Sequence, residues 1–297
     1  MAVADLLPFS TNAALAANLR EYADLLEQQG ADRFRVVAYH HAADVVEHLD
    51  VPAAEIFASG GRKALIALSG IGTSIAAGLA ETIITGRWSQ LERLRGSLEP
   101  EELLQTIPGI GPELASRLCE QLHVENLAAL EIAAYNGSLA RTKGFGPRRI
   151  QMVRSILSER LGRPRLRQLS QKQPRPPVSV VLDVDHAYRE QASMGRLKTI
   201  APKRFNPKGR AWLPVMHTRR GPWQLTALFS NSRRANELGR VGDWVVIYYH
   251  TDTSLEGQCT IVTERRGPCA GMRVVRGRED ECMLSAKLVP NQAEPVS

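Results

Sequence analysis

Apolar positions near the start of the chain recur at the spacing of a helix. The series is Leu15, Leu19, Tyr22 and Leu26, with intervals of four, three and four residues. These intervals place the four side chains on one helical face. Asn12 can cap the start of this helix and Gly30 can end it.

The same reasoning predicts helices through the rest of the first half. The second helix is expected to turn Phe34, Val37, Ala38, Ala42, Val45 and Leu49 inward, with Arg33, Arg35, His40 and His41 on or near its outer side. Further helices are expected at residues 62–68, 75–86, 88–95, 101–106, 113–122 and 127–134, and from residue 147 to about Leu161. No strand is expected before residue 175.

After the prolines at 176 and 177, the pattern changes to short, β-branched runs with alternating polarity. The candidate strands are Val178–Asp183, Leu213–His217, Gln224–Phe229, Trp244–Tyr249, Cys259–Thr263 and Met272–Val275, with a short helix at Ser232–Leu238. The expected fold class is therefore multidomain α and β, an all-α array followed by a β-rich α+β domain. The expected division is residues 1–162, a linker at 163–177, a β-rich domain at 178–288 and a flexible tail at 289–297.

One turn sequence occurs three times in the helical half. Two glycines flank an apolar residue at Leu68–Thr73, Ile107–Pro112 and Thr142–Pro147, and the first glycines are 39 and 35 residues apart. Repeats at such a period indicate a stacked helical array. Glycine allows a tight turn, and the amides at the start of the next helix favour an anion. Three plain helix connections are the simpler alternative.

Basic residues are concentrated where the two halves meet. Residues 141–175 contain eleven basic residues against one acid, Glu159, whereas residues 1–160 contain 15 basic and 19 acidic ones. A basic stripe beside phosphate-type turns indicates nucleic acid, although a proline-stiffened, solvated linker would look the same. A second basic and aromatic cluster could hold a backbone and stack on an unpaired base, or be a solvated loop: Lys198, Lys203, Arg204, Phe205, Lys208, Arg210 and Trp212.

Together, these motifs resemble the N-terminal part of bacterial family X DNA polymerases, over residues 10 to 162. The matching segments are Phe34–Tyr39, the first hairpin at Leu68–Thr73, Thr85–Arg87 and the later hairpins at Ile107–Pro112 and Gly144–Pro147. The resemblance implies an eight-kilodalton-type domain followed by helix-hairpin-helix repeats. The second half resembles bacterial helix-hairpin-helix proteins of uncharacterised activity.

By matching position, the resemblance implies DNA-phosphate contacts through hairpin amides, with nearby basic side chains adding to them. The residues concerned are Gly70, Gly72, Gly109, Gly111, Lys143, Gly144, Gly146, Arg148 and Arg149. The resemblance also implies a monovalent cation bound by the backbone carbonyls of Leu68, Ile71, Ile107 and Ile110. No other cofactor is expected.

Two departures from the family pattern argue against its chemistry. The position of the abasic-site lyase lysine is Gly78, and a phosphate-contacting lysine is replaced by Ser74. The chain also has too few residues for a polymerase palm, fingers and a phosphatase-like domain together. Polymerase and lyase activities are therefore expected to be absent.

The alternative is an enzyme. Asp183 and Asp185 would share one face of a strand and could hold Mg²⁺ for a nucleotidyltransferase or nuclease. The Gly-Ser motif that precedes such a pair in the family is missing, and two solvent-facing or arginine-paired acids are the simpler interpretation.

Neither the cysteines nor the apolar runs indicate another class of protein. Cys119, Cys259, Cys269 and Cys282 form no CxxC pair, so reduced thiols in the cytoplasm are expected. No apolar run reaches the length of a membrane span.

From the turns, the basic stripe and the resemblance together, we expect a nucleoid-associated, non-sequence-specific DNA-binding protein of repair. Its expected partners are gapped, nicked or damaged DNA and a repair protein; an adaptor with purely structural hairpins is the third alternative.

Overall fold

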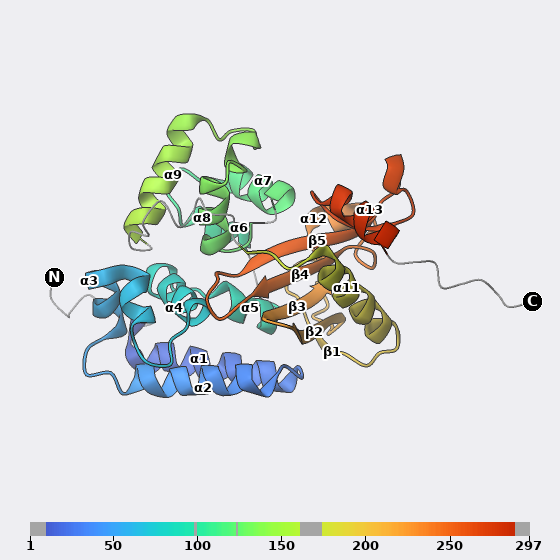
Figure 1. Cartoon of the computed structure of the whole chain (residues 1–297). Coiled ribbons are helices and arrows are strands. Elements are labelled where there is room, and N and C mark those ends of the chain that lie inside the picture. Colours follow the sequence, from blue (N-terminus) through green and yellow to red (C-terminus); the bar gives the residue numbers. More distant parts are fainter. Residues whose placement is uncertain (1–9, 98–99, 123, 161–173, 289–297) are drawn as a thin grey trace, which may run out of the picture.

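Helices make up the first half of the chain and an antiparallel sheet dominates the second, as the computed structural model shows (Figure 1). It describes residues 10–97, 100–122, 124–160 and 174–288. The expected fold class is confirmed. Among the described helices, none combines the length and apolar character needed to cross a bilayer.

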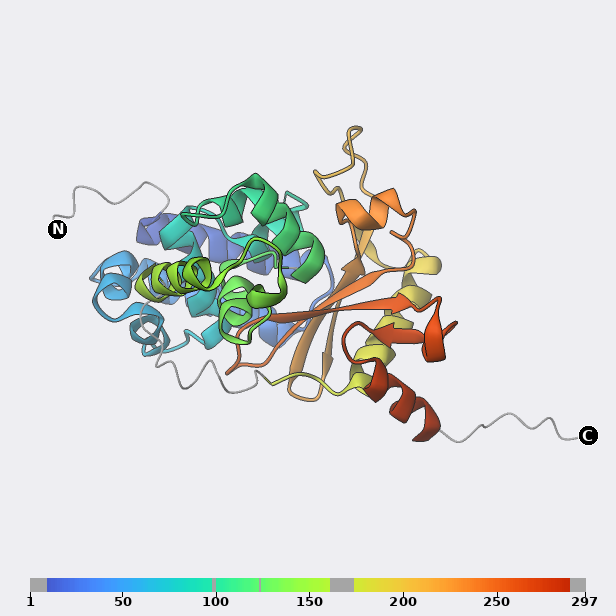
Figure 2. The same ribbon diagram turned by 90° about the horizontal axis from the view of Figure 1, so that it is seen from above.

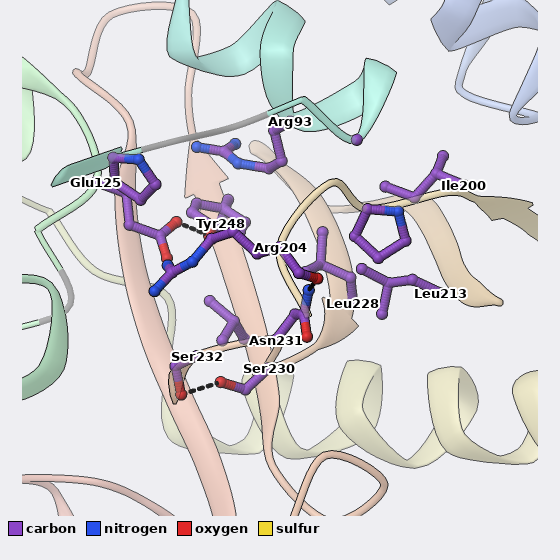
Figure 3. Close-up of a pocket in the computed structure, with 14 residues that line it drawn as sticks. Arg93, Glu125, Ile200, Arg204, Leu213, Leu228, Ser230, Asn231, Ser232 and Tyr248 are labelled. Atoms are coloured by element: carbon purple, nitrogen blue, oxygen red, sulfur yellow. Dashed lines mark hydrogen bonds between the residues drawn. The ribbon is translucent and has the colours of Figure 1, made fainter. Parts of the chain in front are cut away.

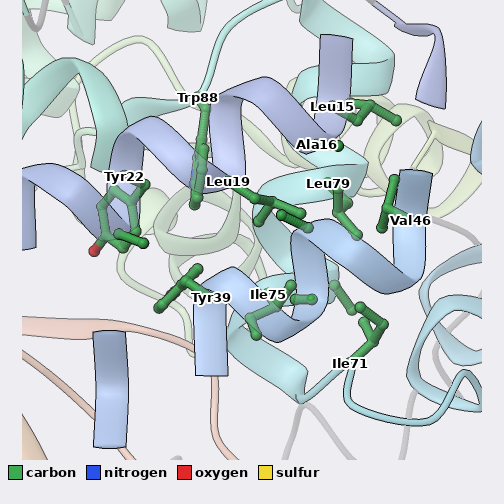
Figure 4. Packing of buried hydrophobic residues seen from close by; sticks show 14 of the residues in the cluster. Leu15, Ala16, Leu19, Tyr22, Tyr39, Val46, Ile71, Ile75, Leu79 and Trp88 are labelled. Atoms are coloured by element: carbon green, nitrogen blue, oxygen red, sulfur yellow. The ribbon is translucent and has the colours of Figure 1, made fainter. Parts of the chain in front are cut away.

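The first helical unit is built around α1 and α2, with the later helices packed on them. Its elements are α1 (Asn12–Gln28), α2 (Arg33–Glu47), α3 (Ala53–Ile66), α4 (Thr73–Thr85) and α5 (Ser89–Arg95). The predicted face of α1 is confirmed, because all four of its apolar residues are buried. Figure 4 shows Tyr22, Tyr39 and Trp88 meeting at one end of this core and Ile71, Ile75 and Leu79 continuing it.

Two details of this unit differ from the sequence prediction. Thr11 caps α1, accepting a hydrogen bond from the Ala14 amide at 3.2 Å, so the assignment of that cap to Asn12 was wrong. The Asn12 carboxamide instead accepts from the Ala53 amide at 2.8 Å. It therefore ties the start of α1 to the start of α3.

The inner face predicted for α2 was also wrong in part. Phe34 is 78% exposed and Val37 is 54% exposed, whereas Arg35 and Tyr39 are buried. Arg35 can be buried because its guanidinium donates to the Tyr22 hydroxyl at 2.8 Å and to Thr226 of the sheet at 3.3 Å. A helical wheel cannot anticipate partners that are distant in sequence.

The second helical unit has a core of its own. It comprises α6 (Pro100–Gln105), α7 (Pro112–Leu122), α8 (Leu127–Tyr135), the 3₁₀ turn η3 (Leu139–Arg141) and α9 (Pro147–Arg160). Ile107, Ile110, Leu118, Phe145 and Val153 are buried together at its centre. The hairpin residues thus form part of this core.

The sheet is an antiparallel meander whose order follows the sequence. Its strands are β1 (Lys198–Ile200), β2 (Leu213–Arg220), β3 (Trp223–Phe229), β4 (Val245–His250), β5 (Gly257–Thr263) and β6 (Arg273–Val275). The last five predicted strands correspond to β2 to β6, and the predicted short helix is α12 (Arg233–Glu237). A 3₁₀ turn, η4 (Gly267–Cys269), precedes β6.

The first predicted strand, Val178–Asp183, was wrong. These residues begin α11 (Val178–Ser193). The β-branched run suggested a strand, but the buried positions Val178, Val181, Val184 and Tyr188 have helical spacing. The helix lies across the sheet beside α13 (Glu279–Leu288), on the side away from the N-terminal helices (Figures 1 and 2).

The other face of the sheet is buried against the helical half through polar contacts. His217 of β2 hydrogen-bonds the Gln29 side chain at 2.9 Å and the Thr226 hydroxyl at 3.0 Å. Burial, with the nearby Arg35 and Arg93 charges, lowers the pKa of His217 well below its usual value and that of His250 to about 3. Both imidazoles are therefore neutral in the folded protein at pH 7.

Candidate nucleic-acid interface

The three glycine turns have the same backbone geometry. The first glycine of each, Gly70, Gly109 and Gly144, is left-handed with φ of 81°, 84° and 97°. The next residue is buried, and its amide donates to the residue three positions earlier: Ile71 to Leu68 at 3.1 Å, Ile110 to Ile107 at 3.0 Å and Phe145 to Thr142 at 3.1 Å. A positive φ favours glycine at these three positions.

The second glycine of each turn begins the outgoing helix. The carbonyls of Gly72, Gly111 and Gly146 accept the first helical hydrogen bonds, at 2.9, 2.9 and 3.1 Å. The first amides of a helix lack carbonyl partners within it, and the helix dipole adds positive potential there. Each turn can therefore offer amides to an anion.

The three turns are called hairpin one (Leu68–Thr73), hairpin two (Ile107–Pro112) and hairpin three (Thr142–Pro147). Hairpins two and three are open to an approaching chain, whereas hairpin one faces a cleft. Among the described residues, and apart from the glycine's own chain neighbours, no atom lies within 4 Å of the place where a Cβ on Gly111 or Gly146 would stand. The corresponding place on Gly72 is 3.7 Å from the Asp252 carbonyl oxygen. The cleft beside Gly72 has a volume of about 530 Å³, and Arg35, Arg219 and Asp252 are its charged lining residues.

Hairpins two and three cover each other's first glycine. A Cβ on Gly109 would lie 2.1 Å from the Met152 methyl group of α9, and one on Gly144 would lie 2.7 Å from a Leu114 methyl group of α7. The Arg117 guanidinium on α7 also donates to the Lys143 carbonyl at 2.9 Å. The outgoing helix of each hairpin thus packs on the turn of the other, so the two turns form one unit.

Basic side chains favour hairpin three over hairpin two. Lys143 and Arg148 are exposed beside hairpin three, and the Arg149 guanidinium donates to the Gly144 carbonyl. At hairpin two the adjacent charge is acidic, because the first turn of α7 carries Glu113, which pairs with Arg117. Most of the basic stripe beyond Arg160 lies outside the described residues.

Comparison with known families identifies both helical units. Residues 10–88 match a family described as a helix-hairpin-helix domain, and residues 101–159 match a SAM-like helix-hairpin-helix tandem. The first half of the chain is a helix-hairpin-helix region. Such domains are typical of proteins that bind DNA without sequence specificity. A comparison with curated proteins found no match.

Tight packing surrounds the two positions at which the family resemblance implies lysines, one for the lyase and one for a phosphate contact. A Cβ on Gly78 would lie 2.5 Å from the Trp88 indole nitrogen, so a lysine there would require the indole to move. Ser74 is buried and its hydroxyl lies 3.4 Å from that of Tyr39. Glycine and serine at these positions fit the core of the first helical unit.

The predicted pairing of Asp183 and Asp185 on one strand face was wrong. Residues two apart on a helix point in different directions. Asp183 pairs with Arg220 of β2 at 2.8 Å, whereas Asp185 pairs with Arg273 of β6 at 2.5 Å. Three strands separate β2 from β6. Within the described residues, no group of three or more His, Cys, Asp or Glu side chains could hold a metal ion.

The structure also bears on the predicted cation site and on the second basic cluster. The carbonyls of Leu68 and Ile107 each accept the turn hydrogen bond, so a cation would have to use their second lone pairs; cation binding there stays a prediction. In the second basic cluster, Arg204 pairs with Glu101 at 2.8 Å and Trp212 packs against the sheet. Phe205 is exposed at a positive φ of 52°.

Sequence reasoning missed the charged groups that join the two halves. A small cavity of about 70 Å³ lies where Arg93, Glu125 and Tyr248 meet from separate parts of the chain (Figure 3). Tyr248 donates to the Glu125 carboxylate, and the Arg93 guanidinium lies 3.4 Å from the centre of the Tyr248 ring. Burial raises the pKa of Glu125. No motif connects these residues, because each lies more than thirty positions from the next.

Proposed function

We propose that this protein binds DNA without sequence specificity in DNA repair, holding gapped, nicked or otherwise damaged duplexes. The observation that carries the proposal is the pairing of hairpins two and three, whose open helix starts lie in one packed unit. Two amide sites held in this way can contact phosphates without recognising bases. The resemblance to family X polymerases supports the link to repair.

The phosphate contacts are assigned to the amides around Gly109, Gly111, Gly144 and Gly146, with Lys143, Arg148 and Arg149 adding positive charge. Hairpin one, at Gly70 and Gly72, would contribute only where DNA enters the cleft beside Asp252. The turn carbonyls would hold a monovalent cation.

The proposal keeps the domain boundaries that the sequence predicts. Residues 1–162 bind DNA, residues 163–177 extend the basic surface, and residues 178–288 add a second contact or recruit a repair partner. Such a protein would work in the cytoplasm, on the nucleoid. Polymerase and lyase chemistry are not part of this function.

Replacement of the second glycines tests the proposal. Gly111→Val with Gly146→Val places branched side chains over the amides, where the structure has open space. Hydrogen bonds to a charged group contribute about 1.5–3 kcal/mol, so affinity for a gapped duplex should fall about tenfold or more. Gly242→Val is the matched control, because Gly242 is also open and lies outside the hairpins.

Affinity is measured on gapped, nicked, single-stranded and intact DNA at several salt concentrations, with thermal unfolding of each variant as a check on folding. Binding should weaken steeply as salt rises. Equal affinity of the hairpin variant and the control would instead mean that the hairpins only pack helices, as in an adaptor.

A further inference from the structure

A polar cleft lies between the second helical unit and the sheet, away from the hairpin turns. Its volume is about 300 Å³. Leu122, Ala129, Ile132 and Ala133 form an apolar wall from the α7 and α8 side, and β5 lies opposite. Pro174 and Arg175, just before α11, add to the lining. Tyr249 of β4 and Arg276 and Arg278 after β6 also line the cleft, so it joins several separate segments of the chain.

The polar atoms of two β5 side chains are buried at this cleft, and no partner for them is found within the described residues. The amide nitrogen and the oxygen of Gln258 and the hydroxyl of Thr260 have no hydrogen bond within the described part of the chain. Thr260 is only 3% exposed. In the strand register, Gln258 lies opposite Tyr248 and Thr260 lies opposite Val246. Both are therefore on the sheet face toward the N-terminal helical units.

An unpaired buried polar group destabilises the folded protein. The free donor and acceptor of Gln258 therefore favour a ligand that supplies both. A carboxamide forms two such bonds with a nucleobase edge that carries adjacent donor and acceptor atoms, as adenine does.

The charge around the cleft favours a phosphate. Arg175, Arg276 and Arg278 line it, and Glu256 is the one acid among the described lining residues. Glu256 is neutralised by Arg93 at 3.0 Å. Arg278 pairs with Glu281 at 2.7 Å, which offsets its charge, and it donates to the Pro176 carbonyl at 2.9 Å, so the positive potential of the cleft comes mainly from Arg175 and Arg276. Guanidinium groups suit phosphate oxygens.

We propose that this cleft binds a nucleoside phosphate. The Gln258 carboxamide and Thr260 hydroxyl would contact the base, the apolar wall would cover its ring, and the arginines would hold the phosphate. The nucleotide is either free in solution or an unpaired nucleotide of bound DNA. The inference does not depend on DNA binding by the hairpins.

Binding of each deoxynucleoside 5′-monophosphate and of inorganic phosphate to the full chain is measured by calorimetry. Gln258→Leu should lower nucleotide affinity about tenfold, the loss expected for one well-paired carboxamide. It should leave thermal stability unchanged or raised, because an unpaired group is removed. Arg175→Gln should lower affinity similarly, with exposed Arg265→Gln as its control.

A second arm compares a duplex carrying one unpaired nucleotide with a fully paired duplex. If free nucleotides do not bind but Gln258→Leu removes a preference for the unpaired nucleotide, the source is DNA. The proposal is overturned if neither arm responds to Gln258→Leu, if phosphate alone binds as tightly as nucleotides, or if Gln258→Leu destabilises the fold. Loss of hairpin function leaves the calorimetric result unchanged, so the two proposals fail separately.

Discussion

Arg93 and Glu256 form a buried ion pair across the boundary between the two halves of the chain. Two guanidinium nitrogens of Arg93 lie 3.2 and 3.0 Å from the two carboxylate oxygens of Glu256. Arg93 belongs to α5, and Glu256 immediately precedes β5. The sheet is therefore joined to the first helical unit by a desolvated charge pair as well as by apolar packing.

Breaking this pair should destabilise the protein strongly. Arg93→Met leaves the Glu256 carboxylate buried without its partner, which costs about 3–5 kcal/mol. Urea unfolding should show this loss in the free energy of unfolding. Arg93→Met combined with Glu256→Met should recover much of it, because neither member of the pair is then buried without the other. A double variant as unstable as the sum of the single ones would contradict the assignment.

Glu81 should make stability fall as pH rises. Burial raises its pKa to about 7, against 4.5 in the unfolded chain, although the Ser89 amide and hydroxyl both donate to it. The folded state therefore holds a proton that the unfolded state releases between these values. Its stabilising effect is complete below pH 4.5 and is lost as pH rises through about 7.

Glu81→Gln tests this titration, since glutamine keeps an acceptor for Ser89. The free energy of unfolding of the variant should equal that of the native protein at pH 4 and exceed it at pH 8, by on the order of 3 kcal/mol at most. Thermal unfolding across that range measures the difference. A difference that stays constant with pH would show that Glu81 does not titrate in this way.

The two aspartates of α11 should differ sharply in their contribution to stability. Asp185 is 2% exposed and receives two hydrogen bonds from Arg273, at 2.9 and 2.5 Å. Asp185→Asn should cost about 3–5 kcal/mol. The Asp183 side chain is 58% exposed, so Asp183→Asn should change stability by less than about 1 kcal/mol.

The same pair of variants separates a structural role from a catalytic one. Incubation with Mg²⁺, nucleotides and gapped DNA should give no product that depends on Asp183. A product lost in Asp183→Asn, a variant expected to fold normally, would restore the enzyme hypothesis.

Arg148 should contribute one phosphate contact. It is exposed next to hairpin three. Arg148→Gln should weaken binding to all sequences alike and reduce the slope of log affinity against log salt by about 1. Arg266→Gln, an exposed arginine far along the chain, serves as the charge-matched control. Equal slopes for the two variants would place the DNA elsewhere.

The sequence predicted local features well and long-range ones poorly. The three turns were recognised because glycine spacing and buried apolar residues lie within six positions of one another. The prediction of a strand at Val178 was wrong because a run of β-branched residues is typical of a strand. The helical spacing of Val181, Val184 and Tyr188 becomes decisive only when the sheet that they cover is known.

Arg35 shows the same limit at a single residue. Its burial depends on Thr226, 191 positions away, so pattern alone assigns it to the surface. The unpaired groups of Gln258 and Thr260 were beyond sequence reasoning for the same reason. Burial without a partner becomes visible only when the helices that cover β5 are in place.

The sheet contacts the first helical unit through Arg93 and Glu256 and the second through Glu125 and Tyr248. These contacts fix the position of hairpin one relative to hairpins two and three. A duplex bound at all three turns would have to follow the path that this arrangement sets. DNA already softened by a gap or a nick would bend to that path at a lower energetic cost than an intact helix.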